Sequence, residues 1–403
     1  MLAQHGSVRP RRFVAIALLL LLAACDSGGP APAPPEPVHP QWKQLTLPAP
    51  PGAAGRELVR DAIHCGANWY VGGGVGTPAG DTRPALWSTA DAAATTGWAP
   101  VPIDTVNDYY AIRSVLYALG CRDGRVAAIG AKSGGAHGNP RVRTFYSRAD
   151  GTLVAVPSTD FELYGGGRQV STNRIAGGGP GGWLIAGNRA GGATVWTSPD
   201  ATLFTIHEDL APLANSPELG TSATDTVAVP AGWVVSGGGR PAGRIDRDPF
   251  VWTSADARAW TRVPLPGTPD DEEAQRLVRT PDGIVAVGLA GTGFAAWHGD
   301  LSGGGWSAAS RFGATGAGVV AGIDGLAILD GASRLVAATT GADGHRLWTA
   351  DLAGKGWQSV ATPVQVGSGG ATGTAVGGSG DTLVLLADDG TASTAWASQF
   401  PGP

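Results

Sequence analysis

The sequence has little charge, and it lacks the three- and four-residue spacing of apolar residues that amphipathic helices show. Only 15% of its 403 residues are charged, whereas 64 are glycine and 30 are proline. Short runs rich in Val, Ile, Trp and Thr are separated by clusters of Gly, Pro, Asp and Asn, a pattern typical of many-stranded all-β proteins. Because 43% of the residues are hydrophobic, the chain can bury a sizeable core.

Motifs for several common chemistries are also missing. The sequence contains no G-x-S-x-G nucleophile elbow, and its histidines do not show the spacing of metal ligands. Residues 177–182 (GGGPGG) match G-x-G-x-x-G, but they fall in an expected strand-to-strand turn with no helix behind them. Such a turn offers no helix N-terminus to a phosphate. We therefore expect neither a metal nor another cofactor.

The N-terminal 24 residues have the features of an export signal. Three arginines precede the apolar run Phe13–Leu22, which is too short to cross a bilayer comfortably. The following stretch, Leu22–Cys25, resembles the lipobox of bacterial lipoproteins. This resemblance implies that the signal peptide comprises residues 1–24 and that Cys25 is lipidated. An ordinary secretory cleavage site is the alternative.

The rest of the chain divides into a tether and a folded domain. Residues 25–40 are rich in proline and predict an extended tether, which leaves 41–403 for the domain. Removal of residues 1–24 would take away three arginines and no acidic residue, so the formal net charge would change from −5 to −8. An acidic exterior argues against a nucleic-acid partner, because phosphate binding needs clustered Lys and Arg.

An aromatic residue recurs every 45–59 residues. A small or polar residue follows it and, in most units, so does an Asp turn. A strand ending in Gly or Ala precedes each aromatic, a strand that opens with Trp often follows, and a further strand, such as 57–65 or 110–119, fits into each interval. Four strands per unit predict a seven-bladed, all-β propeller with four-stranded antiparallel blades. The recurring aromatics are Trp87, Tyr146, Trp196, Trp252, Trp297, Trp348 and Trp396.

The seventh unit is one strand short after Trp396. The segment Trp42–Pro48 (WKQLTLP) matches Trp260–Pro266 (WTRVPLP), the outer strand of the fourth unit. We therefore predict that this N-terminal strand pairs in the last blade and closes the ring, which removes two free sheet edges. An open array of seven units is the alternative.

The turn Ser254–Asp256 followed by Trp260, with its counterparts in the other units, resembles degenerate Asp-box (BNR) repeats of sialidase-type propellers. The resemblance covers the repeat skeleton from Trp42 onward. It departs from the family in the variable gap between Asp and Trp and in Tyr146 of the second unit. Because these turns are structural in that family, the resemblance implies a fold and not an activity.

Sialidase activity needs three arginines on the substrate carboxylate, a tyrosine–glutamate pair and an acidic aspartate. Arg60, Arg174 and Arg276 lie at the starts of predicted inner strands and could face the central channel. No tyrosine–glutamate pair stands out in the sequence. We therefore predict these arginines as candidate binding residues and assign no catalytic residue. Solvation, or pairing with aspartates, is the alternative role.

The connections that precede the inner strands and the loops between second and third strands lie at the same end of the predicted propeller. We call this end the loop face. Tyr109, Tyr110, Phe161 and Tyr164 fall in such connections. Exposed aromatics beside mixed charges suit recognition of a protein or a glycan. Plain solvated loops are the alternative.

Cys65 and Cys121 each close the inner strand of one of two adjacent units. Outside the cytoplasm a cysteine pair is commonly oxidised, and equivalent positions in adjacent blades can come within bridging distance. We predict a disulfide between them. Two buried free thiols are the alternative.

These observations predict a lipid-anchored binding or scaffold protein on the extracytoplasmic side of a bacterial cell membrane, or in the periplasm. Its role is more consistent with binding than with catalysis, and its oligomeric state is left open by the sequence. The expected partner is an envelope protein or a glycan, recognised by the loop face. The alternatives are a sialidase-like glycoside hydrolase and a passive structural subunit of an envelope complex.

Overall fold

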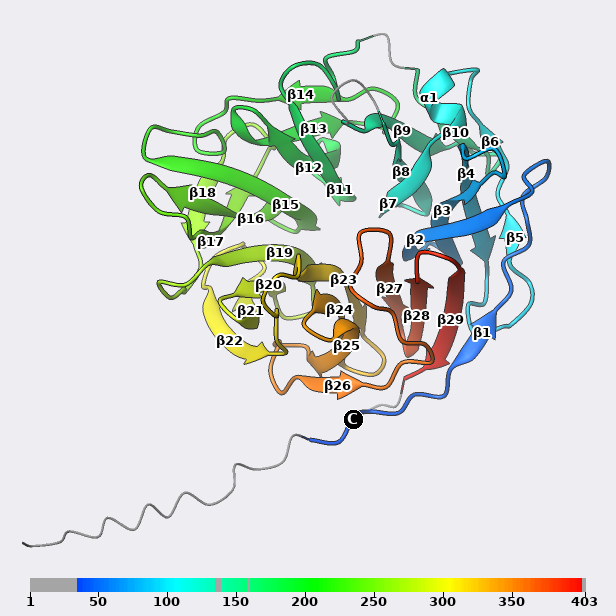
Figure 1. Cartoon of the computed structure of the whole chain (residues 1–403). Helices are drawn as coiled ribbons and strands as arrows, with labels where there is room; N and C mark the ends of the chain where they lie inside the picture. Colours follow the sequence, from blue (N-terminus) through cyan, green and yellow to red (C-terminus); the bar gives the residue numbers. More distant parts are fainter. Residues whose placement is uncertain (1–34, 135–138, 158–159, 401–403) are drawn as a thin grey trace, which may run out of the picture. The chain divides into compact units, whose positions relative to one another are not determined.

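The computed structural model describes residues 35–134, 139–157 and 160–400. Residues Glu36–Pro403 form one compact unit, in which seven β-sheets are set around a central channel (Figure 1). The predicted seven-bladed propeller is therefore confirmed. Within the described ranges no helix is long and apolar enough to cross a membrane.

The first three blades run from the channel outward in chain order. Blade one contains β2 (Arg56–Cys65), β3 (Asn68–Gly76), β4 (Thr82–Thr89) and β5 (Ala99–Pro100). The four antiparallel strands of blade two are β7 (Val115–Arg122), β8 (Arg125–Lys132), β9 (Arg141–Ser147) and β10 (Leu153–Ala155). Blade three contains β11 (Gln169–Gly179), β12 (Gly182–Arg189), β13 (Gly192–Ser198) and β14 (Thr205–His207).

Blades four to six repeat the same order. Blade four contains β15 (Leu219–Val229), β16 (Gly232–Pro241), β17 (Asp248–Ser254) and β18 (Thr261–Pro264). Blade five contains β19 (Glu272–Arg279), β20 (Ile284–Ala290), β21 (Gly293–Gly299) and β22 (Ser307–Phe312). Blade six contains β23 (Gly322–Leu329), β24 (Arg334–Gly341), β25 (Gly344–Asp351) and β26 (Gln358–Val360).

Blade seven closes the ring with strands from both ends of the unit. It contains β27 (Gly373–Ser379), β28 (Thr382–Asp388), β29 (Ser393–Gln399) and, outermost, β1 (Lys43–Leu45). Strand β1 is antiparallel to β29, as predicted. The N-terminal segment also reaches blade six, because Val38 pairs with Val360 and the Trp42 indole donates to the carbonyl of Ala361 over 2.8 Å. The N-terminal segment therefore joins blade six to blade seven.

Blade two departs from the expected pattern at both of its edges. Its inner strand was expected over 110–119, but Tyr109–Ile112 forms the short helix α1, and β7 begins only at Val115. The helix forms because the Asp108 carboxylate caps it and accepts the backbone N–H groups of Tyr110 and Ala111. At the outer edge, β6 (Ile103–Asp104) adds a fifth strand parallel to β10.

Tryptophans of the third strands lie in the core between blades. Trp87, Trp252 and Trp297 are fully buried. Their indole N–H groups donate to the carbonyls of Pro48, Pro212 and Pro266 respectively. A buried indole needs such a partner, and each of these carbonyls lies in the connection that leads into the same blade. These aromatics therefore fix the connections between blades.

The Asp turns lie at the end of the propeller opposite the loop face, between third and fourth strands. The Asp256 carboxylate accepts the backbone N–H groups of Arg258 and Ala259 at 2.8 and 3.0 Å. Asp351 accepts those of Ala353 and Lys355 in the same way. These hydrogen bonds give the recurring Asp a structural role in the turn.

Candidate functional site

Six of the seven inner strands carry an extra residue at an equivalent place, which shifts the register with the second strand, while β27 is regular. Strand β11 carries two further extra residues, Val170 and Gly178. A β-bulge of this kind re-aims the side chains around it. Because these bulges occupy equivalent places in their blades, they bring side chains from the same position of each blade to the channel. The extra residues at this equivalent place are Arg60, Tyr117, Asn173, Thr224, Gln275 and Asp324.

Four of these bulge side chains tie their blade to the next one. The Asn173 amide donates to the carbonyl of Ala223 over 2.7 Å, and the hydroxyls of Tyr117 and Thr224 donate to the equivalent carbonyls of the following blades at 2.8 and 2.7 Å. Gln275 accepts the backbone N–H of Ile323 at 2.9 Å. These contacts hold the wall of the channel together.

Two aspartates directly follow a bulge, in blades one and four, and each also connects its blade to the next one. Asp61 accepts the backbone N–H of Leu119 at 2.8 Å, and Asp225 accepts that of Leu277 at 3.0 Å. Burial raises the pKa of both carboxyls, although the guanidinium groups of the channel lower it in part. Both aspartates therefore act as buried connections between neighbouring blades.

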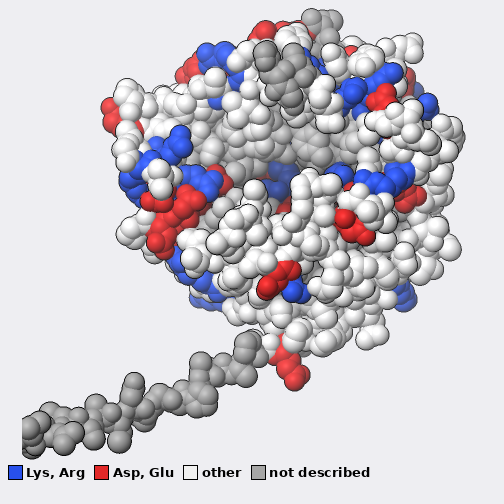
Figure 2. Space-filling view, in the orientation of Figure 1, with Lys and Arg blue, Asp and Glu red and all other residues white. Residues whose placement is uncertain are grey.

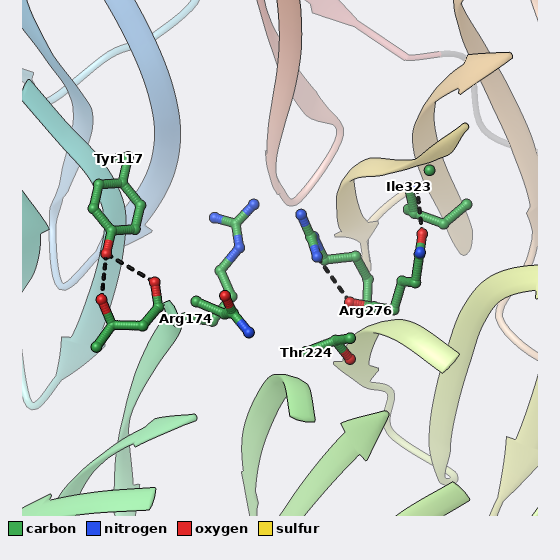
Figure 3. Close-up of a pocket in the computed structure, with 9 residues that line it drawn as sticks. Tyr117, Arg174, Thr224, Arg276 and Ile323 are labelled. Carbon is green, nitrogen blue, oxygen red and sulfur yellow. Dashed lines mark hydrogen bonds between the residues drawn. The ribbon is translucent and has the colours of Figure 1, made fainter. Parts of the chain in front are cut away.

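Two arginines occupy the equivalent place in blades three and five and extend toward one another into the channel (Figure 3). Arg174 and Arg276 line a cavity of about 470 Å³. Arg174 Nη2 and Arg276 Nη2 donate to the same main-chain carbonyl, that of Asp324, at 3.1 and 3.3 Å. Figure 2 shows Lys or Arg side chains at the centre of the ring. The remaining lining residues are Tyr117, Thr172, Asn173, Thr224, Gln275, Gly322 and Ile323.

The two arginines differ in how their charge is compensated. Arg174 Nη1 lies 3.0 Å from Asp61 Oδ2 and forms an ion pair. Arg276 forms no ion pair with any described residue, and its buried Nε has no hydrogen-bond partner among them. Burial and then the charge of Arg174 lower the pKa of Arg276 to about 10, although the charges of Asp225, Asp324 and Asp61 raise it in part. The guanidinium is therefore still charged at neutral pH. Its charge is available to an acidic ligand.

The third predicted arginine is not brought to this cavity. Arg60 Nη1 and Arg56 Nη1 bind the two carboxylate oxygens of Asp388 in blade seven, at 2.7 and 2.8 Å. Arg60 instead lines a neighbouring cavity. The structure therefore offers two converging arginines rather than three.

The predicted aromatic set is only partly exposed. Tyr109 and Phe161 are 55% and 56% exposed, and Tyr110 is half-buried. The prediction is wrong for Tyr164, which is only 6% exposed because its ring packs 6.1 Å from that of Trp196. Burial also raises the pKa of the Tyr164 hydroxyl. Tyr164 therefore belongs to the core between blades.

The two cysteines of the inner strands meet at the end opposite the loop face. Cys65 and Cys121 are joined by a disulfide, with their Cα atoms 5.5 Å apart. This bond links blades one and two. Within the described ranges, no group of three or more His, Cys, Asp or Glu side chains is placed to hold a metal ion.

Sequence reasoning missed the aspartates and Tyr117 of the channel wall. A signal for part of this set was present, because Arg174, Asp225 and Arg276 are spaced 51 residues apart. Charged residues at equal offsets in successive blades indicate one shared level of the channel. Tyr117 carries no such charge and could be assigned only once the bulges were known.

Neither the protein-family models nor the curated proteins contain a match to this chain. Among solved structures, it is similar to the β-propeller domain of the Trilobed protease from Pyrococcus furiosus, with 10% identity over 86% of this chain and 96% of that chain and a TM-score of 0.47. The endosialidase of phage phi92 has 10% identity over 90% and 70% of the two chains and a TM-score of 0.49. Trypanosoma rangeli sialidase has 10% identity over 86% and 55%, with a TM-score of 0.42.

Proposed function

We propose that this chain is a non-catalytic binding protein of the bacterial envelope that recognises a protein or a glycan with its loop face. An acidic group of the partner is held between Arg174 and Arg276. The observation that carries the proposal is the half-buried Arg276, whose Nε has no hydrogen-bond partner and which forms no ion pair among the described residues, although the charges of Asp225, Asp324 and Asp61 act on it from a longer distance. A buried unpaired charge is unfavourable, and a guanidinium binds carboxylates with two parallel hydrogen bonds.

A sialidase-like hydrolase is the second candidate, and the aspartates of the channel favour it. Burial raises the pKa of Asp61 and Asp225, as it does for many catalytic acids. Two observations favour binding instead. Both carboxylates already accept backbone N–H groups on each oxygen. The Tyr117 hydroxyl donates to the carbonyl of Thr172, and burial raises its pKa, so it offers no phenolate nucleophile.

A passive structural role is the third candidate. The converging arginines weigh against it, because two guanidinium groups repel one another and only Arg174 forms an ion pair with a described residue. The location of the protein rests on the lipobox-like Leu22–Cys25, which lies outside the described residues. We propose that a lipid on Cys25 holds the propeller on the extracytoplasmic side of the membrane.

Binding and turnover can be measured side by side on the purified full-length chain. Immobilised polyglutamate and polygalacturonate serve as acidic protein-like and glycan-like probes, and a fluorogenic sialoside reports hydrolysis. We expect at least one acidic probe to bind and this binding to be lost in Arg276→Gln. The matched control is Arg279→Gln, at the exposed far end of the same strand, which should bind as the unchanged protein does.

The same measurements separate the three candidates. Sialoside turnover that disappears in Arg174→Ala would replace the proposal by the hydrolase. Absence of both turnover and Arg276-dependent binding would favour the passive role.

A further inference from the structure

We infer that the partner is a protein, bound through an extended segment that ends in a free C-terminal carboxylate preceded by aliphatic side chains. The segment lies in a groove that runs from the channel across blade two toward the rim. The inference rests on the proposed function, because it places the terminal carboxylate at Arg174 and Arg276. It adds the class of partner and the path that the partner follows.

The groove consists of three neighbouring cavities, which are adjacent because they share lining residues. Tyr117 and Thr172 line both the channel cavity and a second cavity of about 500 Å³. Pro140 and Val142 line both this second cavity and a narrow cleft beside Phe161. The three spaces therefore follow one another from the arginines of the channel to the exposed ring of Phe161.

The middle of the groove is aliphatic. Leu58, Val115, Val142 and Val170 line it, and Val170 is 57% exposed although it is an apolar residue on a strand. Of the seven exposed large hydrophobic side chains in the described residues, four come from the segment 106–170. Two of these four, Val170 and Phe161, line this cavity and the adjoining cleft, and exposed apolar side chains of this kind indicate a surface that a partner covers. Aliphatic side chains of a peptide fit such a surface.

The aromatic rings at the outer end argue for a peptide rather than a glycan. Sugars are bound largely by stacking on open aromatic faces, but Tyr110 and Phe161 of the outer cleft, and Tyr109 next to Tyr110, each already have a guanidinium over one face. Arg113 lies 4.0 Å from the centre of the Tyr109 ring. Arg143 lies 5.1 Å from that of Tyr110, and Arg141 lies 4.7 Å from that of Phe161. Arg113 and Arg143 also form ion pairs with Asp81 and Asp108, so the rim carries mixed charge, and its guanidinium–aromatic pairs suit the backbone carbonyls of a polypeptide.

The groove wall also holds an acceptor that lacks a donor. Gln169 donates its amide N–H to the carbonyl of Pro140 over 2.8 Å. Its Oε1 is buried and has no partner within the described part of the chain. A buried acceptor without a donor is unfavourable. Because Gln169 lines the groove, a backbone N–H of a bound segment would satisfy it.

Fluorescence polarisation with short labelled peptides tests the inference on the full-length chain. The probe is fluorescein–Gly-Ser-Gly-Leu-Val-Leu with a free C-terminal carboxylate. Its two controls are the same peptide with a C-terminal amide and the acid Gly-Ser-Gly-Ser-Gly-Ser. We expect the probe to bind about tenfold more tightly than either control, because each control loses a charge-assisted hydrogen bond or buried apolar side chains.

Two variants locate the binding. Val170→Asp places a carboxylate in the groove at an exposed position, and we expect it to weaken the probe about tenfold or more with an unchanged melting temperature. Leu203→Asp is the matched control, because Leu203 is also exposed (72%) and lies in the turn between β13 and β14 at the opposite end of the propeller. It should leave the affinity unchanged.

The outcomes for this inference and for the proposed function are distinguishable. Both acid peptides could bind equally well, and their binding could be lost in Arg276→Gln but not in Val170→Asp. In that case the acidic site stands and the groove is overturned. If only polygalacturonate binds in an Arg276-dependent manner, the site stands and the peptide partner is overturned. If no acidic probe responds to Arg276→Gln, both are overturned.

Discussion

Arg174 of blade three forms an ion pair with Asp61 of blade one, although 113 residues separate them. The pair passes beside blade two, whose own residue at this level is the uncharged Ala118. Asp61 thereby compensates one of the two channel arginines and leaves Arg276 without an ionic partner among the described residues. The difference between these arginines underlies the proposed binding site.

The contributions of two buried aspartates, Asp225 and Asp388, to the free energy of unfolding should depend on pH in opposite ways. Burial raises the pKa of Asp225 above the usual value of about 3.9. Its contribution to the free energy of unfolding is therefore fully present below that value and is lost as pH rises through the raised pKa. For Asp388, burial acts in the same direction, but the hydrogen bonds from Arg60 and Arg56 outweigh it and lower the pKa. Its contribution is present above about 3.9 and is lost as pH falls through the lowered pKa.

Urea unfolding of Asp225→Asn and Asp388→Asn across the acidic to neutral range measures both effects. As pH rises, Asp225→Asn should gain stability relative to the unchanged protein, whereas Asp388→Asn should lose it. Parallel curves for the two variants would show that these carboxylates do not titrate in the manner described.

Closure of the ring by β1 predicts a strong effect of one leucine. Leu45 is buried between β1 and blade one, so Leu45→Ala should reduce the free energy of unfolding by about 2–4 kcal/mol. The control is Gln44→Ala, because Gln44 is exposed on the same strand. Removal of residues 1–34 should leave the melting temperature nearly unchanged, and removal of residues 1–48 should lower it sharply. Equal melting temperatures for the two truncations would contradict closure by β1.

The disulfide should stabilise the propeller by restricting the unfolded chain. Cys65 and Cys121 close a loop with a separation of 56 residues, for which loop entropy suggests about 4 kcal/mol. The double variant Cys65→Ala, Cys121→Ala should therefore unfold at lower urea, and a reductant should destabilise only the unchanged protein. Peptide mass mapping that found both thiols free in the native protein would refute the bond.

Lipidation of Cys25 is tested on the intact protein. Expression in a bacterial host should give a membrane fraction in which the mature chain begins at a lipidated Cys25. Cys25→Ser should release the protein from that fraction. An intact mass of the membrane-bound protein without a lipid on Cys25 would end this part of the proposal.

The fold could be predicted because its signals repeat. A turn or aromatic that occurs seven times is recognisable even when single copies are degenerate, and the match of Trp42–Pro48 to an outer strand gave the closure. One local element failed for a physical reason, since the Asp108 cap made a helix of residues that strand spacing had assigned to an inner strand. Such a cap acts through one side chain and leaves no periodic pattern.

The site could be predicted less well, because its geometry depends on contacts between distant blades. The channel position of Arg174 and Arg276 followed from their place in the repeat. Arg60 does not join these two arginines because it pairs with Asp388, 328 residues away. No spacing in the sequence reveals that pair. Tyr164 was predicted as an exposed loop aromatic, and only the packing of its loop onto Trp196 decided otherwise.

The most direct test of the acidic binding site is the NMR signal of the Arg276 Nε–H group. A selective ¹⁵N–¹H spectrum of the arginine side chains, assigned through Arg276→Gln, is recorded with the tightest acidic probe and with its amide or neutral counterpart. We predict that the Arg276 signal shifts with the acidic probe alone, while that of Arg279 stays in place. Saturating binding of the acidic probe with no change at Arg276 would contradict the site.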